Sequence, residues 1–360
     1  NINFVISRCK FIKCNGRSSN ANILTVNGQN NANITFEFCE FIDCSNTTSK
    51  SLVNFQSSSS SANFTECIFT FNENSPGCKV LDCDGEIAVF DRCEFTRCET
   101  DTIRIDHQTA HSSESGTFQF TNNTVTKMNG QLIHIGNTRV TIQFEGNTFT
   151  DIVINSGYFI QLFHNSEQLT ISRNTFSQFT TSASTSCGGI VTFFEKKDGS
   201  SFKLVYDQCK FIDITSTDAT SNGGAVSFIN SIDITLTNCL FIRNKACKHG
   251  GAVSIKVSGN VVIQNCTFEE NRASSASTSA SLLDEKTAYR GGAIFLSQVS
   301  GSTSNITIEG CNFKYNLAFD AYAIYIENED ATASYNIVNN KFTNNFNGDT
   351  TQQSTGAIIA

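Results

Sequence analysis

Apolar residues recur along the chain about every thirty positions, and each recurrence alternates apolar and polar residues as β-strands do. One copy is the stretch NITIEGCNFKYN at residues 305–316, in which we set Cys311 as position zero. Position −3 is large and apolar in every copy, and position +2 is Phe except at Val125. The twelve zero positions are Cys9, Cys39, Cys67, Cys93, Asn123, Asn147, Asn174, Cys209, Cys239, Cys266, Cys311 and Asn340.

Each copy predicts short strands joined by corners. Positions −5 and −3 share one face of a strand, and so do positions 0 and +2, but the alternation slips by one residue between −3 and 0. A bend near positions −2 and −1, where Gly146 and Gly310 stand, returns both pairs to one interior. A further apolar strand precedes the later copies, at 225–228, 252–255, 293–296 and 323–326. Three strands per copy predict an all-β fold, a single-stranded parallel β-helix of about twelve coils.

Stacked coils lie about 4.8 Å apart, so equivalent residues lie over one another. We expect the Phe at +2 to form an interior aromatic stack that includes Phe241, Phe268 and Phe313. Position +5 is Asn in five copies, and we expect these residues to occupy left-handed corners and to share amide hydrogen bonds between coils. The five are Asn72, Asn244, Asn271, Asn316 and Asn345.

The chain has 15 Cys, eight of them at the zero position. Ladder members about 4.8 Å apart do not match the Cβ separation of about 3.8 Å in a disulfide, so we expect thiols there. The ladder members are Cys9, Cys39, Cys67, Cys93, Cys209, Cys239, Cys266 and Cys311. Pairs separated by one corner leave disulfides within a coil open: Cys9/Cys14, Cys39/Cys44 and Cys93/Cys98.

The repeat runs through all 360 residues, which predicts one solenoid segment over residues 1–360 with an insertion loop at 272–289. The chain opens on one strand and closes at the start of another without polar caps. We therefore expect the solenoid to continue at both ends, through more sequence or through further copies stacked end to end. A net charge of −8 argues against nucleic acid as a partner, and no apolar run has the length of a transmembrane segment.

Two surface features are candidates for modification or contact. Six Asn-x-Ser/Thr sequons are permitted glycosylation sites, because the strand alternation places all of them outward or in loops. They begin at Asn33, Asn46, Asn63, Asn122, Asn265 and Asn305. The insertion loop holds apolar and acidic residues that we expect to contact a partner: Leu282, Leu283, Asp284 and Glu285.

Catalytic chemistry has weak support in the sequence. The densest acidic group has a basic residue and a histidine nearby and could hold Ca²⁺ or act as acid and base on a sugar, but a solvated charged face is the favoured interpretation. Its members are Asp82, Asp84, Glu86, Asp101 and Asp106, with Arg104 and His107. No Cys-x-x-Cys pair suggests zinc. We predict no catalytic residues, no metal and no cofactor.

Two short motifs recur together in the later copies. Gly-Gly-Ala-Val/Ile stands at 223–226, 250–253 and 291–294, and Phe-x-x-Asn at 69–72, 241–244, 268–271, 313–316 and 342–345. This pairing resembles the polymorphic outer membrane protein repeat of chlamydial surface adhesins and of protist surface proteins. The resemblance covers roughly residues 209–345, and it implies a right-handed β-helix displayed outside the cell and working in adhesion.

Sequence and resemblance together predict a non-enzymatic, extracellular or cell-surface structural or adhesin-type protein. Its expected partner is a protein or glycan on another cell or matrix, or further copies of itself. The alternative is a carbohydrate-binding or polysaccharide-cleaving β-helix that uses a groove.

Overall fold

The computed structural model describes residues 2–14, 21–26, 32–44, 51–55, 60–72, 79–83, 87–98, 102–106, 116–136, 140–164, 168–182, 189–190, 192–196, 202–230, 233–257, 259–274, 289–298, 303–327, 332–347 and 358–359. They form two compact units. The first comprises residues 1–153, 158–166 and 193–200, and the second comprises residues 154–157, 167–192 and 201–360. The prediction of one solenoid concerns how the units join, and it stays a prediction.

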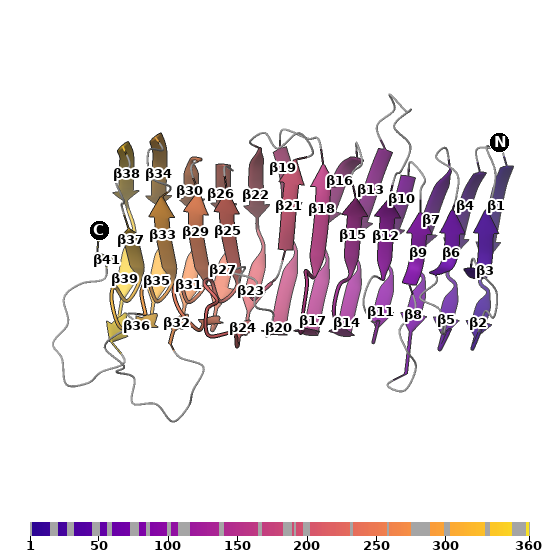
Figure 1. Ribbon diagram of the computed structural model, residues 1–360, viewed down its shortest axis with the longest axis horizontal. Helices are drawn as coiled ribbons and strands as arrows, with labels where there is room; N and C mark the ends of the chain where they lie inside the picture. The colour runs from indigo at the N-terminus through magenta and orange to yellow at the C-terminus, as the bar shows by residue number, and fades with distance from the viewer. Residues whose placement is uncertain are drawn as a thin grey trace. The chain divides into compact units, whose positions relative to one another are not determined.

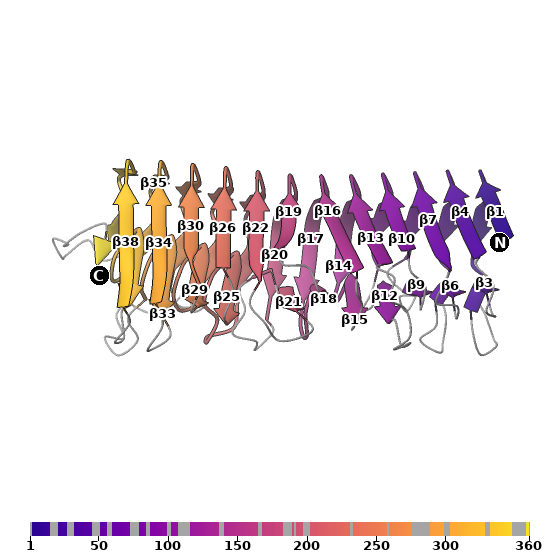
Figure 2. The same ribbon diagram turned by 90° about the horizontal axis from the view of Figure 1, so that it is seen from above.

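In both units the residue at −3 lies in a parallel sheet that we call the first sheet. The strands of the first unit follow the order β1 (Ile2–Ser7), β4 (Ala32–Glu37), β7 (Ser61–Thr65), β10 (Ile87–Asp91), β13 (Gly116–Thr121) and β16 (Val140–Glu145). Those of the second are β19 (Gln168–Ser172), β22 (Lys203–Asp207), β26 (Asp233–Thr237), β30 (Val261–Gln264), β34 (Thr303–Glu309) and β38 (Thr332–Val338), seen side by side in Figure 2.

The second sheet carries the Phe at +2. Its strands in the first unit are β2 (Lys10–Ile12), β5 (Glu40–Ile42), β8 (Ile68–Thr70), β11 (Glu94–Thr96), β14 (Thr124–Asn129) and β17 (Thr148–Ile154). In the second unit they are β20 (Thr175–Thr181), β23 (Lys210–Ile212), β27 (Leu240–Ile242), β31 (Thr267–Glu269), β35 (Asn312–Lys314) and β39 (Lys341–Thr343). Two-residue strands extend it beyond the next corner: β24 (Thr215–Ser216), β28 (Lys245–Ala246), β32 (Arg272–Ala273), β36 (Leu317–Ala318) and β40 (Phe346–Asn347).

A third strand in each coil completes the turn. In the first unit these are β3 (Ala21–Val26), β6 (Ser51–Phe55), β9 (Lys79–Cys83), β12 (Ile103–Asp106), β15 (Ile133–Gly136), β18 (Ile160–His164) and β21 (Thr192–Lys196). In the second they are β25 (Val226–Asn230), β29 (Val253–Val257), β33 (Ile294–Gln298), β37 (Ile324–Glu327) and β41 (Ile358–Ile359), four of which stand side by side in Figure 1. The fold is therefore the predicted all-β parallel β-helix.

Coils pair in the register that the sequence predicts. Phe36 pairs with Phe64 in the first sheet, and Phe241 pairs with Phe268 in the second. Their rings stack nearly parallel: centroids lie 5.0 Å apart for Phe36–Phe64 and 4.8 Å apart for Phe241–Phe268, whose next neighbour Phe313 follows at 5.0 Å. All five rings are fully buried, which confirms the interior aromatic stack.

Left-handed residues make the corners. Position −1 has positive φ in each of the described copies, as at Asn122 (56°) and Gly146 (70°), so the bend predicted near −2 and −1 is confirmed. A second left-handed residue stands at +4, as at Arg243 (52°) and Glu270 (56°). The prediction that the Asn at +5 takes this conformation is wrong. Before Asn244, Asn271, Asn316 and Asn345 the preceding residue turns the chain, and the Asn side chain is thereby directed inward, whereas Asn72 is exposed and follows a residue without positive φ.

The glycine pairs make a third corner in the second unit. The first glycine of each pair is left-handed, as at Gly250 (φ 64°), a conformation that glycine adopts without steric cost. The second glycine has no room for a side chain, since a Cβ on Gly251 would lie 2.0 Å from the Gly292 carbonyl oxygen of the next coil. Close contact between coils therefore requires glycine at both positions.

Truncating a stacked ring should destabilise the second unit. Phe241→Ala or Phe268→Ala leaves a cavity between two rings, and we expect a loss of about 3–5 kcal/mol in the free energy of unfolding. Chemical denaturation followed by circular dichroism measures it, with Tyr315→Ala, whose ring is exposed, as the control. Unchanged unfolding for both Phe variants would mean that the inward register is wrong.

Candidate functional site

Most zero-position residues from Cys39 onward lie in the interior and bind the preceding coil. The Cys39 and Cys67 thiols donate to the carbonyls of Ile6 and Phe36, at Sγ–O distances of 3.3 and 3.4 Å. Asn123 does the same through its amide, with 3.0 Å from Nδ2 to the Phe90 oxygen. In each case the acceptor is the carbonyl at −3 of the coil before. The predicted ladder of Cys and Asn is therefore present, and Cys and Asn have the same role in it.

The Asn residues at +5 repeat this contact one corner later. Asn244 and Asn271 donate to the carbonyls at +2 of the preceding coil, Phe211 and Phe241, each at 3.0 Å. They also bind each other, with 2.9 Å from Nδ2 of Asn244 to Oδ1 of Asn271, and Asn271 donates to Asn316 at 3.0 Å. The predicted amide ladder is confirmed for Asn244, Asn271, Asn316 and Asn345, while the fifth predicted member, Asn72, is exposed. The side chains of Asn244, Asn271 and Asn316 are fully buried and committed to coil stacking.

The Asn271 side chain both donates a hydrogen bond to the preceding coil and accepts one from it, and two substitutions should separate these roles. The Asn244 backbone N–H donates to Oδ1 of Asn271 at 3.1 Å, and the Asn271 N–H donates to Asn316 in the same way at 3.0 Å. Asn271→Ala removes the first acceptor. We expect each buried group left without a partner to lower the free energy of unfolding by about 1–3 kcal/mol. Asn271→Cys should lose less, because Cys44 makes the equivalent donor contact with the Phe11 carbonyl. Equal unfolding free energies for the two variants, by chemical denaturation, would contradict this.

The described cysteines are all free thiols. The Cys-x₄-Cys pairs for which a disulfide was left open, including Cys39/Cys44, are therefore unbridged. Burial raises the pKa of the Cys93 thiol and raises that of Cys44 to about 11, so both stay protonated near neutral pH. Cys9, in contrast, is exposed. The buried ladder thiols therefore act as small hydrogen-bond donors in the interior.

The extent to which each cysteine is alkylated without prior reduction should depend on how deeply its thiol is buried. We expect iodoacetamide to modify Cys9 in the folded protein and to leave Cys93 and Cys239 unmodified until denaturant is added. Peptide mass spectrometry gives the modified fraction of each cysteine. A disulfide between Cys239 and Cys266 would contradict the parallel ladder.

Sequons lie on the outer surface where the structure describes them. Asn33, Asn122, Asn265 and Asn305 are exposed, and Asn63 is half-buried, while Asn46 lies outside the described residues. The exposed positions are those predicted from strand alternation. Their occupancy stays a prediction.

The predicted partner-contact residues, Leu282, Leu283, Asp284 and Glu285, lie outside the described residues. The segment that follows them is described and carries a polar cluster. Arg290 bonds Glu327 at 2.7 Å and lies 4.7 Å from the Tyr325 ring centre. The ring of His249 stacks on Phe295, and burial, with Lys248 and Arg290 nearby, lowers the pKa of His249 to about 4. This neutral imidazole accepts from the Arg290 backbone, so the cluster fixes the end of the loop.

The acidic group is only partly described. Asp82 and Arg104 stand in register on β9 and β12, while Asp84, Glu86, Asp101 and His107 lie outside the described residues and Asp106 is described in its backbone alone. Among the described residues, no group of three or more His, Cys, Asp or Glu side chains is placed to hold a metal ion.

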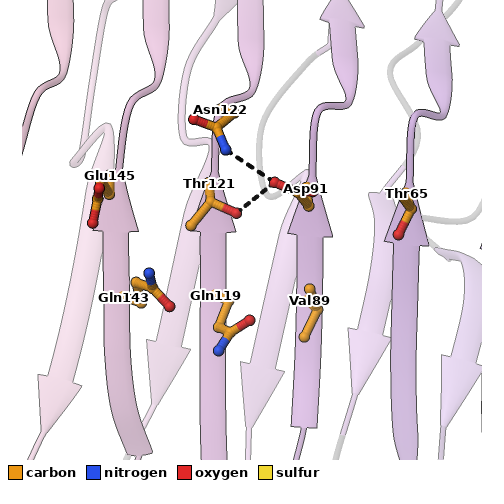
Figure 3. A pocket seen from close by; sticks show the side chains of 8 residues that line it. All are labelled: Thr65, Val89, Asp91, Gln119, Thr121, Asn122, Gln143 and Glu145. Carbon is orange, nitrogen blue, oxygen red and sulfur yellow. Dashed lines mark hydrogen bonds between the residues drawn. The ribbon is translucent and has the colours of Figure 1, made fainter.

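An open groove of about 380 Å³ lies on the outer face of the first sheet in the first unit, and we call it the polar groove. It crosses β7, β10, β13 and β16 (Figure 3). Its side chains come from the outward positions −4 and −2, with Asn122 at the −1 corner. They are Thr65, Val89, Asp91, Gln119, Thr121, Asn122, Gln143 and Glu145. Amides and hydroxyls dominate, and no Lys or Arg lines it.

Asp91 is the fixed centre of this groove. Its Oδ1 accepts from the Thr121 hydroxyl at 2.8 Å and from Nδ2 of Asn122 at 3.1 Å (Figure 3). Its Oδ2 pairs with Nη1 of Arg92 at 2.5 Å. Both oxygens of the carboxylate therefore have partners within the protein, which hold the Asp91 side chain in one place.

The same arrangement recurs in the second unit. Oδ1 of Asp207 accepts from the Thr237 hydroxyl at 2.9 Å and from Nδ2 of Asn238 at 3.1 Å. Its recurrence indicates that the Asp–Thr–Asn contact is itself a way of joining coils. The polar groove differs from this second site in the residues beside the contact, which are Gln119, Gln143 and Glu145.

The polar groove was not identified from the sequence, because the candidate residues there were the sequons, the insertion loop and the acidic group around Asp82. The sequence does show the polar residues of the groove, at positions −4 and −2 of consecutive copies. Gln119 and Gln143 occupy −4 in consecutive copies, beside the acidic Asp91 and Glu145 at −2. Strand register makes these residues neighbours.

The fold and the groove define a class of protein, the parallel β-helix solenoid. A family model described as a right handed beta helix region matches residues 3–176 and 193–360. The chain therefore belongs to the right-handed β-helix family. No curated protein and no solved structure matches the chain.

No helix that is long and apolar enough to cross a membrane occurs among the residues that the structure describes.

Proposed function

We propose that the chain is part of a non-enzymatic protein displayed outside the cell, and that it attaches to a glycan through the polar groove. The composition of the groove is the observation that carries this proposal. Planar amides and carboxylates beside hydroxyls can donate to and accept from the hydroxyl pairs of a sugar. Because no cationic side chain lines the groove, a neutral glycan suits it better than an acidic one.

Display outside the cell is supported by two further features. The paired Gly-Gly-Ala-Val/Ile and Phe-x-x-Asn motifs resemble the polymorphic outer membrane protein repeat of surface adhesins, and the described sequon asparagines are exposed except Asn63, which is half-buried. Attachment through the outer face also agrees with the role of the interior, because the Cys and Asn side chains there are committed to coil stacking. Assembly of copies end to end stays a prediction.

Polysaccharide cleavage is the second candidate, because two carboxylates, Asp91 and Glu145, line one groove. Glycoside hydrolysis needs one carboxyl group that can deliver a proton and a second that acts as base or nucleophile. Asp91 is held by Arg92, Thr121 and Asn122 on its two oxygens. Its fixed hydrogen bonds support recognition over proton transfer.

Binding of the unglycosylated chain to a panel of immobilised neutral and acidic glycans tests the proposal. We expect neutral glycans to be retained, and Gln119→Ala and Gln143→Ala each to weaken binding by about threefold to tenfold, the loss of roughly one hydrogen bond. Thr235→Ala, at position −4 of the second unit, is the matched control and should bind as the unchanged chain does.

The same samples distinguish attachment from cleavage. New reducing ends that appear with the unchanged chain and disappear with Asp91→Asn would establish cleavage and overturn a non-enzymatic function. Retention of no glycan, or equal retention by the Gln variants and the control, would contradict the groove as the binding site.

A further inference from the structure

One residue of the polar groove is also the acceptor of a sequon. Asn122 lines the groove, and the triplet Asn122-Asn123-Thr124 has the form Asn-x-Thr. The side chain of Asn122 is exposed, and so is that of Thr124 at the start of β14. Asn123, between them, is buried in the ladder and donates to the Phe90 carbonyl. The acceptor and the hydroxyl residue of the sequon therefore both face solvent.

Two contacts fix where Nδ2 of Asn122 points. Its Oδ1 lies over Gly146 of the next coil, so closely that a Cβ on Gly146 would be 2.5 Å away. Its Nδ2 donates to Oδ1 of Asp91 in the preceding coil at 3.1 Å. Figure 3 shows the amide nitrogen directed towards Asp91 at the edge of the groove. A sugar attached to this nitrogen starts at the groove wall.

We propose that Asn122 is an N-glycosylation site and that a glycan on it closes the polar groove. The inference rests on the proposed function, because N-glycosylation requires the secretory route that display outside the cell implies. It adds regulation to that function: the glycosylated protein and the unglycosylated protein differ in whether the groove admits a ligand.

The chemistry leaves the local structure intact. Nδ2 attacks the anomeric carbon of an oligosaccharide carried on a polyprenyl diphosphate, the new N–C bond replaces the C–O bond to the diphosphate, and Nδ2 gives up one of its two protons. The lipid diphosphate departs with the bonding electron pair. One N–H remains and can still donate to Asp91. The side chain therefore has no need to leave the groove when a bulky sugar is added.

Asn265 provides an internal comparison in the second unit. It occupies the same −1 position, its sequon is Asn265-Cys266-Thr267, and its Oδ1 lies over Gly310, where a Cβ would be 2.7 Å away. The residue at −2 of the coil before it is Thr237, not an aspartate. Asn265 is not among the residues that line the polar groove. A glycan there shares the corner geometry and leaves the polar groove open.

To test this, the full chain is secreted from a eukaryotic host, and the accessibility of the groove is measured through the reactivity of an introduced cysteine thiol. Gln119→Cys places the probe in the groove, and Thr235→Cys places it at the equivalent −4 position of the second unit. Each is made with and without Thr124→Ala, which removes the sequon and keeps Asn122. Peptide mass spectrometry gives the occupancy of Asn122 and the rate at which a bulky maleimide modifies the probe.

We expect Asn122 to be occupied and the probe at 119 to react at least several-fold more slowly than in the Thr124→Ala background. The probe at 235 should react equally in both. Thr267→Ala, which removes only the Asn265 sequon, should leave the reaction at 119 slow. Enzymatic removal of the glycan from the folded protein should restore the fast reaction.

An unoccupied Asn122 would overturn the proposal, and so would an occupied Asn122 with no protection of the probe at 119. The readout needs no ligand. If the probe is protected but the Thr124→Ala protein retains no glycan in the binding panel, the proposed function fails while the closure stands. If that protein retains glycan and the occupied protein does not, both stand.

Discussion

The stacking of the coils depends on a recurring hydrogen bond from an inward side chain to a carbonyl of the coil before. The donor stands just after a left-handed corner residue, and the acceptor is the carbonyl three residues before the equivalent donor in the preceding coil. Cys67 and Asn123 make this contact at the zero position, and Asn271 makes it at +5. The two corners, five residues apart, are therefore stabilised by the same hydrogen-bond arrangement. Without a donor there, a buried carbonyl would be left unsatisfied at each corner.

The interchange of Cys and Asn follows from that requirement. Both side chains are small enough to fit inside a corner, and both donate. Asn also accepts, as when Oδ1 of Asn123 takes the backbone N–H of Cys93 at 2.8 Å. A thiol is the weaker partner but also fills the space as an apolar group does. The ladder thus explains a cysteine-rich chain in which the described thiols are all free.

The outer face obeys a different constraint. Strand register repeats each outward position from coil to coil, so side chains that are far apart in sequence become neighbours in a row. The row through Gln119 and Gln143, with Asp91 and Glu145 beside it, produces the polar groove. Asp91 also joins coils through Thr121 and Asn122. The Asp91 carboxylate therefore both joins coils and lines the polar groove, and its contact with Asn122 connects the sequon there to the groove.

The sequence by itself determined the fold, the register of the coils and the identity of the interior rows. These follow from local alternation and from a repeat whose members align residue by residue, as Phe241 does with Phe268. Which residue turns the corner was not determined. Asn271 can adopt a left-handed backbone, but only the packed corner shows that Glu270 does so and that Asn271 is buried. The polar groove was also decided by tertiary structure, because a groove depends on how outward side chains of different coils fill or leave space. Period and parity fix the direction in which Asn122 points, but not that Gly146 and Asp91 hold its amide.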